Sequence, residues 1–350
     1  MKGSTKYIGV DVGDKYSEVC CTDETGKIVE RTRVKTTREG VRSYFGDCSP
    51  RVVAIEVGTH SPWISQELEH LGHDVVVANP SRVKLITSSD KKSDRTDAEF
   101  LARLVRVDRS LLWPVKHRGE EEARSLLTVR MRAALVRSRT LLINVVRQSV
   151  KSHGHRLAEC SAEAFAEHAR KSLPKELRSE MEAVLVTIDV QTKQIRKSDK
   201  RIGKLEERYP ETQMLRQVDG VGPVTALTFR LVVQSPERFK DSRAVGSYLG
   251  LRPRKDQSGD SDKQLRITKA GDMYLRSLLV GCAQYILGRH GPDCDLRRWG
   301  LKLAERGGKS AKKRAIVAVA RKLSVLLLAL WRSEQKYERI RGSEAPPIAA

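Results

Sequence analysis

The sequence predicts a mixed α/β domain at the N-terminus, a long helical region in the middle and a mainly helical domain at the C-terminus. Residues 7–78 contain short apolar or alternating segments of strand length, whereas residues 120–209 carry apolar side chains at helical spacing. A length of 350 residues allows at least two domains. We expect the chain to divide into residues 1–110, 111–210 and 211–335 as three domains, with residues 336–350 as a disordered tail.

Three strands precede the first predicted helix. Tyr7–Gly13 alternates between apolar and small or acidic residues, so Asp11 lies on the face opposite to its apolar neighbours. Ser17–Thr22 and Ile28–Val34 follow, and the polar, glycine-containing segment between them predicts a hairpin.

Helix and strand then alternate along the chain. Arg51–Val57 is an apolar run with Glu56 near its end, and Asp74–Ala78 is a further buried strand. Ser61–Leu71 is a predicted helix, which Ser61 is placed to cap. This order predicts a mixed sheet with helices on its faces.

Two acids lie at the start of the helical segment Lys91–Leu104. Asp94 and Asp97 are three residues apart and are therefore neighbours on a helix face. Thr96 and Glu99 also fit a capping box, which would put Asp97 at the first helical position and Asp94 just outside the helix. In either arrangement the two carboxylates stay within one turn.

Asp11, Glu56, Asp94 and Asp97 together form a candidate site for Mg²⁺ or Mn²⁺. Phosphodiester chemistry requires such a site to supply clustered carboxylate oxygens and open coordination positions. Each acid could instead be a surface residue, and Asp94 and Asp97 could simply favour a helix N-terminus through its dipole. The order of the elements resembles an RNase H-like (RuvC-like) nuclease domain, whose first acid lies on the first strand and whose second ends the fourth.

The chain is strongly basic, and the excess positive charge lies C-terminal to the first predicted domain. It carries 66 Lys and Arg against 44 Asp and Glu, a net charge of +22. Residues 1–110 hold 18 basic and 17 acidic side chains, so residues 111–350 carry a net charge of +21. This asymmetry predicts a catalytic domain joined to a region that binds nucleic acid.

No membrane association is expected, because the chain has no apolar run of membrane-spanning length and no signal peptide. Ser324–Trp331, its most apolar stretch, predicts a buried helix. The six cysteines form no C-x-x-C pair, which predicts reduced thiols in a cytoplasmic protein.

Two long helical patterns, Glu120–Lys151 and Lys175–Tyr209, predict an antiparallel helical hairpin that is partly a coiled coil. The hairpin can act as a spacer or dimerisation element, or its basic face can contact a duplex or a structured RNA. The candidate nucleic-acid contacts are Arg130, Arg132, Arg137, Arg139 and Arg147.

Val218–Phe229 resembles the hairpin of a helix-hairpin-helix element. Gly220 and Gly222 would let backbone amides approach a DNA phosphate in front of the helix that begins near Pro223. A tight turn at the start of a buried helix explains the same residues equally well.

Gln257–Arg276 leads from a loop rich in Gly and Asp into a basic run predicted to be helical. A serine hydroxyl attacks a phosphate effectively only when cations orient the phosphate and offset its charge. Ser258 in this loop is therefore a candidate nucleophile, and a simple Ser-Gly turn is the alternative. The candidate phosphate ligands around it are Arg254, Arg266, Lys269 and Arg276.

As a whole, the chain resembles the DEDD transposases of insertion sequences, which include pilin-gene-invertase-like, bridge-RNA-guided recombinases. The matching segments are GVDVG with Asp11, AIEVG with Glu56, KSDRTDA with Asp94 and Asp97, VDGVGPVTA, GLRPRKDQSG with Ser258, and RITKAGDMYLR. The resemblance extends over residues 5–335, and the order and distances of the segments make it specific.

The resemblance implies a RuvC-like domain, a coiled-coil insertion and a C-terminal serine transposase domain. It implies that the four acids hold Mg²⁺ in a composite site with Ser258, which forms a phosphoserine link to DNA. It also implies a homodimer or tetramer in the prokaryotic cytoplasm, associated with the nucleoid. There an element-encoded structured guide RNA would pair with double-stranded donor and target DNA.

Other functions fit the same residues. In a metal-only junction nuclease, water attacks the phosphate and Ser258 is structural, whereas a DNA invertase would act without an RNA guide. In a non-catalytic nucleic-acid-binding protein the nuclease fold would be degenerate, and the presence of all four acids argues against this.

Overall fold

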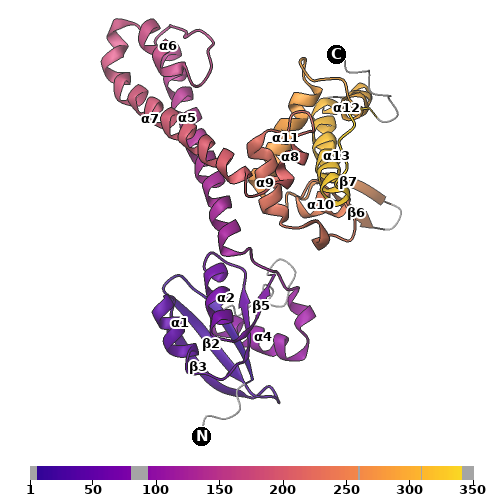
Figure 1. Ribbon diagram of the computed structural model, residues 1–350. Coiled ribbons are helices and arrows are strands. Elements are labelled where there is room, and N and C mark those ends of the chain that lie inside the picture. The colour runs from indigo at the N-terminus through magenta and orange to yellow at the C-terminus, as the bar shows by residue number, and fades with distance from the viewer. Residues whose placement is uncertain (1–5, 80–93, 259–260, 309, 341–350) are drawn as a thin grey trace. The chain divides into compact units, whose positions relative to one another are not determined.

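The computed structural model describes residues 6–79, 94–258, 261–308 and 310–340 (Figure 1). The chain divides into two compact units, residues 1–119 and residues 120–350. The first unit includes the predicted first domain and residues 111–119, and the second unit includes both the long helical region and the C-terminal helices.

A five-stranded mixed sheet forms the centre of the first unit (Figure 1). Its strands are β1 (Tyr7–Val12), β2 (Tyr16–Thr22), β3 (Ile28–Lys35), β4 (Val52–Glu56) and β5 (Asp74–Ala78). They lie in the order β3-β2-β1-β4-β5. The pairs β1-β2 and β2-β3 are antiparallel, and the pairs β1-β4 and β4-β5 are parallel. This confirms the mixed α/β architecture that the order of strands and helices predicts.

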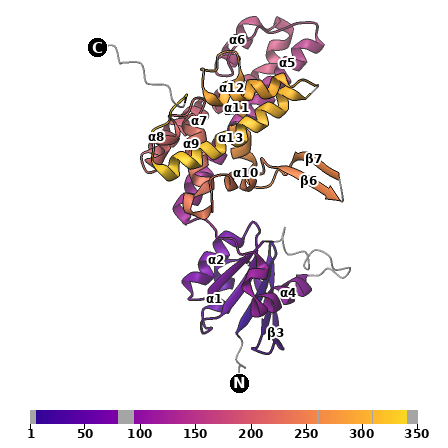
Figure 2. The same cartoon turned by 90° about the vertical axis from the view of Figure 1, so that its right-hand side faces the viewer.

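Helices cover both faces of this sheet (Figure 2). The helices of the first unit are α1 (Arg38–Phe45), α2 (Ser61–His70), α4 (Asp94–Val107) and the short 3-10 helix η1 (Arg109–Leu112). Side chains such as Val10 and Ile55 pack with α1 and α2 in one core, whereas Ala54 packs with Leu101 of α4 in another. Because neighbours along a strand point to opposite faces, these two cores identify the face on which each strand residue lies.

Two local expectations for this unit need correction, and one of its helices has no counterpart among the predicted elements. Helix α1 was not predicted, although Thr37 caps it by accepting the backbone N–H of Gly40 at 3.1 Å. Ser61 is the first residue of α2 and does not cap it, because its hydroxyl donates to the carbonyl of Gly58 instead. Thr96 lies within the first turn of α4, which already includes Asp94, so Thr96 is not the N-cap of this helix.

An arm of three helices begins the second unit (Figure 1). It consists of α5 (Glu120–Ser152), α6 (Phe165–Ser172) and α7 (Lys175–Glu206). Apolar residues at helical spacing pack α5 against α7, and Phe165 of α6 closes the far end of the arm. The predicted antiparallel helical hairpin is confirmed.

Short and long helices form a bundle after the arm. They are α8 (Glu211–Leu215), α9 (Pro223–Val233), the 3-10 helix η2 (Pro236–Arg238), α10 (Ala244–Tyr248), α11 (Met273–Leu287), α12 (Asp295–Glu305) and α13 (Ala311–Ser333). Residues 324–331 lie in α13 at the centre of the bundle, as their apolar character predicts. None of the helices in the described part of the chain is long and apolar enough to cross a membrane.

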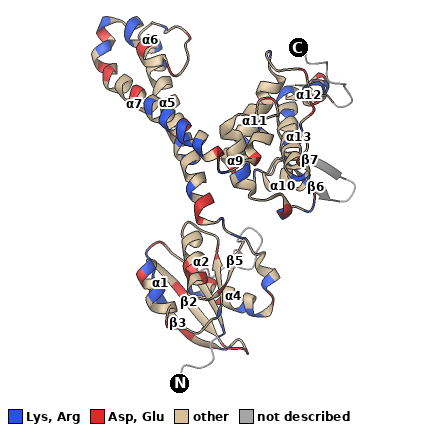
Figure 3. Ribbon diagram, in the orientation of Figure 1, with Lys and Arg blue, Asp and Glu red and all other residues tan. Residues whose placement is uncertain are grey.

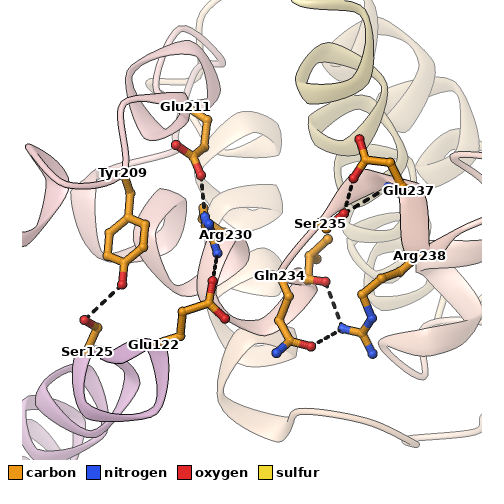
Figure 4. Close-up of polar contacts among 10 residues, drawn as sticks. Glu122, Ser125, Tyr209, Glu211, Arg230, Gln234, Ser235, Glu237 and Arg238 are labelled. Atoms are coloured by element: carbon orange, nitrogen blue, oxygen red, sulfur yellow. Dashed lines mark hydrogen bonds and ion pairs between the residues drawn. The ribbon is translucent and has the colours of Figure 1, made fainter. Parts of the chain in front are cut away.

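A polar cluster joins the base of the arm to the bundle (Figure 4). The guanidinium of Arg230 on α9 forms ion pairs with Glu122 of α5 and Glu211 of α8. The hydroxyl groups of Tyr209 and Ser125 lie 3.1 Å apart beside it. Arg230 is only 16% exposed, so these ion pairs connect the three helices at a place that water reaches poorly, and loss of either partner would leave a poorly solvated charge.

One strand pair interrupts the helices of the bundle. It is formed by β6 (Pro253–Ser258) and β7 (Ser261–Ile267), which pair antiparallel. The predicted helical run through residues 261–267 is therefore wrong, because alternation of polar residues with Leu265 and Ile267 has the period of a strand. The helix begins only at Met273, where Asp272 caps it by accepting the backbone N–H of Leu275 at 2.8 Å.

Candidate functional site

Asp11 and Glu56 lie at the carboxyl ends of two neighbouring parallel strands. Val10 of β1 pairs with Ile55 of β4, so the next position in this register sets Asp11 opposite Glu56. Residues two apart on a strand point to the same face of the sheet, so Glu56 points to the same face as Ala54, which packs against α4. Asp11, which this register sets opposite Glu56, points to that face too, whereas Val10 and Ile55 point to the other face. The two half-buried carboxylates therefore share one end of the sheet and the face that α4 covers.

Helix α4 approaches this face very closely at Gly9. A Cβ atom on residue 9 would lie 2.0 Å from the carbonyl oxygen of Ala98 and 2.4 Å from the amide nitrogen of Ala102. Only glycine leaves room for such a contact between helix and strand backbones. The small residue in the GVDVG segment thus determines how near α4 lies to the strand that carries Asp11.

The direction of α4 places its two acids at the same end of the sheet as Asp11. At the end of the helix, Arg106 donates to the carbonyl of Glu24 in the turn that follows β2, 3.3 Å away. In the first turn, Arg95 lies 3.8 Å from Glu18, which is the strand partner of Asp11. Helix α4 therefore runs antiparallel to β1.

Asp94 and Asp97 both belong to the first turn of α4, and they differ in exposure. Asp97 is 6% exposed, whereas Asp94 faces solvent. The four predicted acids thus come from two strand ends and one helix start, and all of them offer the hard oxygen ligands that Mg²⁺ prefers. Among the described residues, no three His, Cys, Asp or Glu side chains already form a group that could hold a metal.

A set of polar side chains that the sequence did not single out lies beyond the ends of the same strands. Trp63 donates its indole N–H to Nδ1 of His60 at 3.1 Å, and Nε2 of His60 lies 3.3 Å from Asp14. Because Nδ1 accepts, the proton of the neutral ring sits on Nε2 and faces Asp14. His117 is nearby, with Nε2 3.0 Å from the hydroxyl of Ser61, and burial lowers the pKa of His117. Partners 46 and 56 residues apart leave no local signal in the sequence.

The five predicted arginines of α5 fall into two groups, although Lys and Arg are spread along the whole arm (Figure 3). Arg130 forms an ion pair with Asp272 at 3.0 Å, and Arg132 forms one with Asp199, but both side chains keep some exposure. Arg137 is exposed. Among the five predicted arginines, these three can present their charge to a ligand at the surface of the arm.

The other two predicted contacts, Arg139 and Arg147, are used within the arm. Arg139 is 6% exposed and donates to the hydroxyl of Thr192 on α7 at 3.2 Å. Arg147 donates to the carbonyl of Leu157 at 3.3 Å, and its guanidinium lies over the ring of Phe165. The guanidinium of Arg139 is therefore buried, and that of Arg147 is engaged by partners within the arm.

The two glycines between α8 and α9 differ in backbone conformation and in how closely other atoms surround them. Gly220 has a φ of +81°, and a Cβ atom there would lie 2.9 Å from the ring of Tyr285, so this position needs glycine for the turn and for packing. Gly222 precedes Pro223 at the start of α9, and nothing lies within 4 Å of its missing Cβ atom. A glycine hairpin between two helices is present, and α8 is only five residues long.

Ser258 is the last residue of β6 and pairs with Ser261 of β7. It therefore lies at the outer end of a two-stranded hairpin and not in the loop that the sequence predicts. The side chains of residues 255–264, including that of Ser258, and the whole of residues 259–260 lie outside the described part of the structure.

The four cations expected around the serine differ in what they contact. Arg254, Arg266 and Lys269 are exposed on the hairpin or directly after it. Arg276 instead donates to the carbonyl oxygens of Leu249 at 2.9 Å and Ala270 at 2.7 Å. These hydrogen bonds fix the base of the hairpin to the end of α10, so Arg276 is a structural residue.

Comparison with known proteins identifies transposases over most of the chain. The model described as "Transposase IS116/IS110/IS902 family" matches residues 212–297, and a DEDD transposase model for IS110 elements matches residues 8–155. The transposase of insertion sequence element IS1111A from Coxiella burnetii is 30% identical over 345 residues, which cover 95% of this chain and 91% of that protein.

Two further relatives align along nearly their whole lengths. A probable family 20 transposase from Pseudomonas aeruginosa is 29% identical over 94% of this chain and 98% of its own. The pilin gene-inverting protein of Moraxella lacunata is 24% identical over 96% of this chain and 98% of its own.

Proposed function

The chain is a transposase of the IS116/IS110/IS902 family, and from this premise we propose that it cleaves and rejoins donor and target DNA through bound Mg²⁺ or Mn²⁺ and the nucleophile Ser258. The observation that carries the proposal is the placement of the acids. Asp11, Glu56 and the first turn of α4 lie at one end and on one face of the sheet, as a metal-dependent nuclease requires.

The strand order and the position of the acids support an RNase H-like (RuvC-like) identity for the first unit. Its first acid lies on the central strand β1, and its second ends the neighbouring parallel strand β4. Asp94 and Asp97 follow on a helix packed against β1. The conclusion rests on this topology together with the family match.

Asp11, Glu56, Asp94 and Asp97 would hold the metal through their carboxylate oxygens. A bound divalent ion would offset the charge that develops on the phosphate under attack. Gly9 would act as a positioning residue, because its close contact with Ala98 determines how near α4 lies to β1.

Ser258 would attack the scissile phosphate of DNA. Its hydroxyl loses a proton, a bond forms between its oxygen and phosphorus, and the bond from phosphorus to the leaving deoxyribose oxygen breaks as that oxygen takes up a proton. The resulting phosphoserine link conserves the energy of the broken bond, so a second DNA hydroxyl can reverse the step and join the strands. The location of Ser258 at the outer end of β6 supports this role, since that end of the hairpin projects from the helical bundle (Figure 2).

Nucleic-acid partners are supported by the charge of the chain. The net charge of +22 is carried almost entirely behind residue 110. We assign duplex DNA, both donor and target, and a structured guide RNA as the polyanions it binds. The surface arginines Arg130, Arg132 and Arg137 on the arm, Gly222 before α9, and Arg254, Arg266 and Lys269 near the hairpin are the proposed contacts.

A homodimer or tetramer is supported by apolar side chains on the surface of the arm. Leu127, Met131, Leu141 and Val145 of α5 are between 45% and 63% exposed. Their spacing places them along one stripe of the helix, which is the arrangement of a coiled-coil contact. Burial of this stripe against a second copy would remove it from water.

Trapping of the protein–DNA link tests the proposal. Wild-type protein incubated with Mg²⁺ and duplex DNA carrying the element ends should yield a covalent adduct that survives denaturation. Ser258→Ala should abolish the adduct and cleavage together, whereas the matched variant Ser333→Ala, an exposed serine at the end of α13, should retain both.

The competing functions predict different results. Cleavage that survives Ser258→Ala but is lost in Asp11→Asn would identify a metal-only nuclease. Recombination that survives both Asp11→Asn and Glu56→Gln would remove the metal site from the mechanism. Sequencing of RNA that copurifies with the protein tests guidance, and the absence of a discrete structured species would favour an invertase without a guide.

A further inference from the structure

A solvent-open cavity of about 500 Å³ lies in the second unit beside the base of the β6-β7 hairpin. Its lining includes Arg243, Arg252 and Arg321, together with Asp241 and Ser247, and we refer to it as the arginine pocket. Arg243 directly precedes α10, Arg252 directly precedes β6, and Arg321 lies on α13. The fold thus gathers three arginines from three separate elements at one place.

The glycine in α10 lets one of these arginines cross the helix. A Cβ atom on Gly246 would lie 3.1 Å from Cγ of Arg321. Because residue 246 has no side chain, the aliphatic stem of Arg321 rests on α10, and Arg321 is one of the residues that line the pocket.

The charge of the pocket is positive and available to a ligand. Within the described part of the chain, no hydrogen bond or ion pair engages the guanidinium groups of Arg243, Arg252 or Arg321. The carboxylate of Asp241 accepts the backbone N–H groups of Arg243 at 2.8 Å and Ala244 at 3.0 Å, so it already serves the turn before α10. Three guanidinium groups against this single carboxylate fit a doubly hydrogen-bonded oxyanion such as a phosphate.

We propose that the arginine pocket binds a backbone phosphate of the DNA that runs along the β6-β7 hairpin. The inference rests on the proposed function, and it adds a DNA contact at some distance from the reacting phosphate. DNA is favoured over RNA because the wall of the pocket continues directly into β6 through Pro253. The strand from Pro253 to Ser258 covers about 17 Å. At a rise of about 3.4 Å per base pair, the bound phosphate lies about five base pairs from the phosphate at Ser258.

Salt-dependent binding to a fluorescent DNA duplex of about 30 base pairs tests the pocket in the full-length protein. Arg321→Gln should weaken binding about tenfold at moderate salt, since it removes a charged hydrogen bond to phosphate. It should also reduce the slope of log K against log salt by about 0.9, the value for one lost phosphate contact. Arg321→Lys keeps the charge and should retain most of the slope.

Arg298→Gln is the matched control. Arg298 is an exposed arginine of α12 that pairs with Asp293 and does not line the pocket, and its removal lowers the net charge by the same amount. Arg243→Gln repeats the test at an exposed side chain if Arg321→Gln fails to fold, which circular dichroism would reveal.

The outcomes separate the pocket from the proposed function. If the wild type binds the duplex and Arg321→Gln behaves like Arg298→Gln, the pocket proposal is wrong and the proposed function stands. If the wild type binds no duplex, both fall. If Arg321→Gln weakens binding of a structured RNA but not of the duplex, the assignment of the pocket to DNA is overturned.

Discussion

Substitution of Gly9 by alanine should separate α4 from the sheet without removing any functional group. The new Cβ atom would lie 2.0 Å from the carbonyl oxygen of Ala98. Ordinary contact begins at about 3.4 Å, so the local separation has to grow by about 1.4 Å, which is 3.4 minus 2.0. The atoms in the way belong to the backbone of α4, so rotation of a side chain cannot relieve the clash.

The expected cost follows from the size of this shift. Overpacking in a well-packed interior destabilises by about 1–3 kcal/mol. A displacement of catalytic groups by about 1 Å can cost about 100-fold in rate. Because Asp94 and Asp97 lie in the first turn of the displaced helix, we expect Gly9→Ala to lower both the stability of the first unit and the rate of DNA cleavage.

Calorimetry and a cleavage assay measure the two effects in the same preparation. The unfolding transition of residues 1–119 should fall in temperature while that of residues 120–350 stays unchanged. Gly58→Ala is the control, because nothing lies within 4 Å of a Cβ atom on residue 58, and its effect should stay within about 0.5 kcal/mol. Wild-type stability and cleavage in Gly9→Ala would refute the reasoning that this contact positions the acids.

Three further predictions concern stability and thiol chemistry. Gly203→Ala in α7 should raise the free energy of unfolding by about 1 kcal/mol in a urea titration, since Gly203 is an exposed helix residue with nothing near its missing Cβ atom; an unchanged value would contradict this. Glu67→Gln should cost about 1 kcal/mol at neutral pH, because hydrogen bonds from Arg42 and Arg38 lower the pKa of Glu67 below its ordinary value of 4.5. That advantage of the wild type is complete above pH 4.5 and is lost as the pH falls through the lowered pKa, so a difference that does not depend on pH would argue against it. Burial raises the pKa of the Cys21 thiol to about 11, so about one thiol in a thousand is ionised at pH 8 and peptide mapping after iodoacetamide treatment should find Cys21 unmodified in the native protein; alkylation at the rate of an exposed thiol would disprove this.

The sheet and its acids could be predicted because their signals are local. Alternation in Tyr7–Val12 identifies both the strand and the face on which Asp11 lies. Glu56 ends an apolar run that forms strand β4, and the carboxyl ends of neighbouring parallel strands lie at the same edge of the sheet. The position of α4 depends on a different signal, namely Gly9 on β1, whose missing side chain lets the backbone of α4 pack directly against that strand.

The hairpin that carries Ser258 could not be recognised in the same way. Its strands are short and polar, and they pair mainly with each other, so they lack the apolar run that identifies β4. The basic residues that follow the serine have good helix propensity, which favoured a helix from the sequence. The start of α11 is instead determined by Asp272, whose carboxylate caps that helix.

Density of arginine along the sequence does not show which guanidinium groups the fold leaves without a protein acceptor. Arg139 and Arg147 belong to the arginine-rich helix α5, yet their guanidinium groups bond to groups within the arm. The three arginines of the arginine pocket are separated by up to 78 positions and come from three separate elements of the fold. A guanidinium has five donors, and in a compact bundle the nearest acceptors are usually carbonyls and carboxylates of the protein itself. Arginines that the fold leaves without such acceptors, and then gathers in a concave surface, are therefore better candidates for phosphate binding than those that only lie close together in sequence.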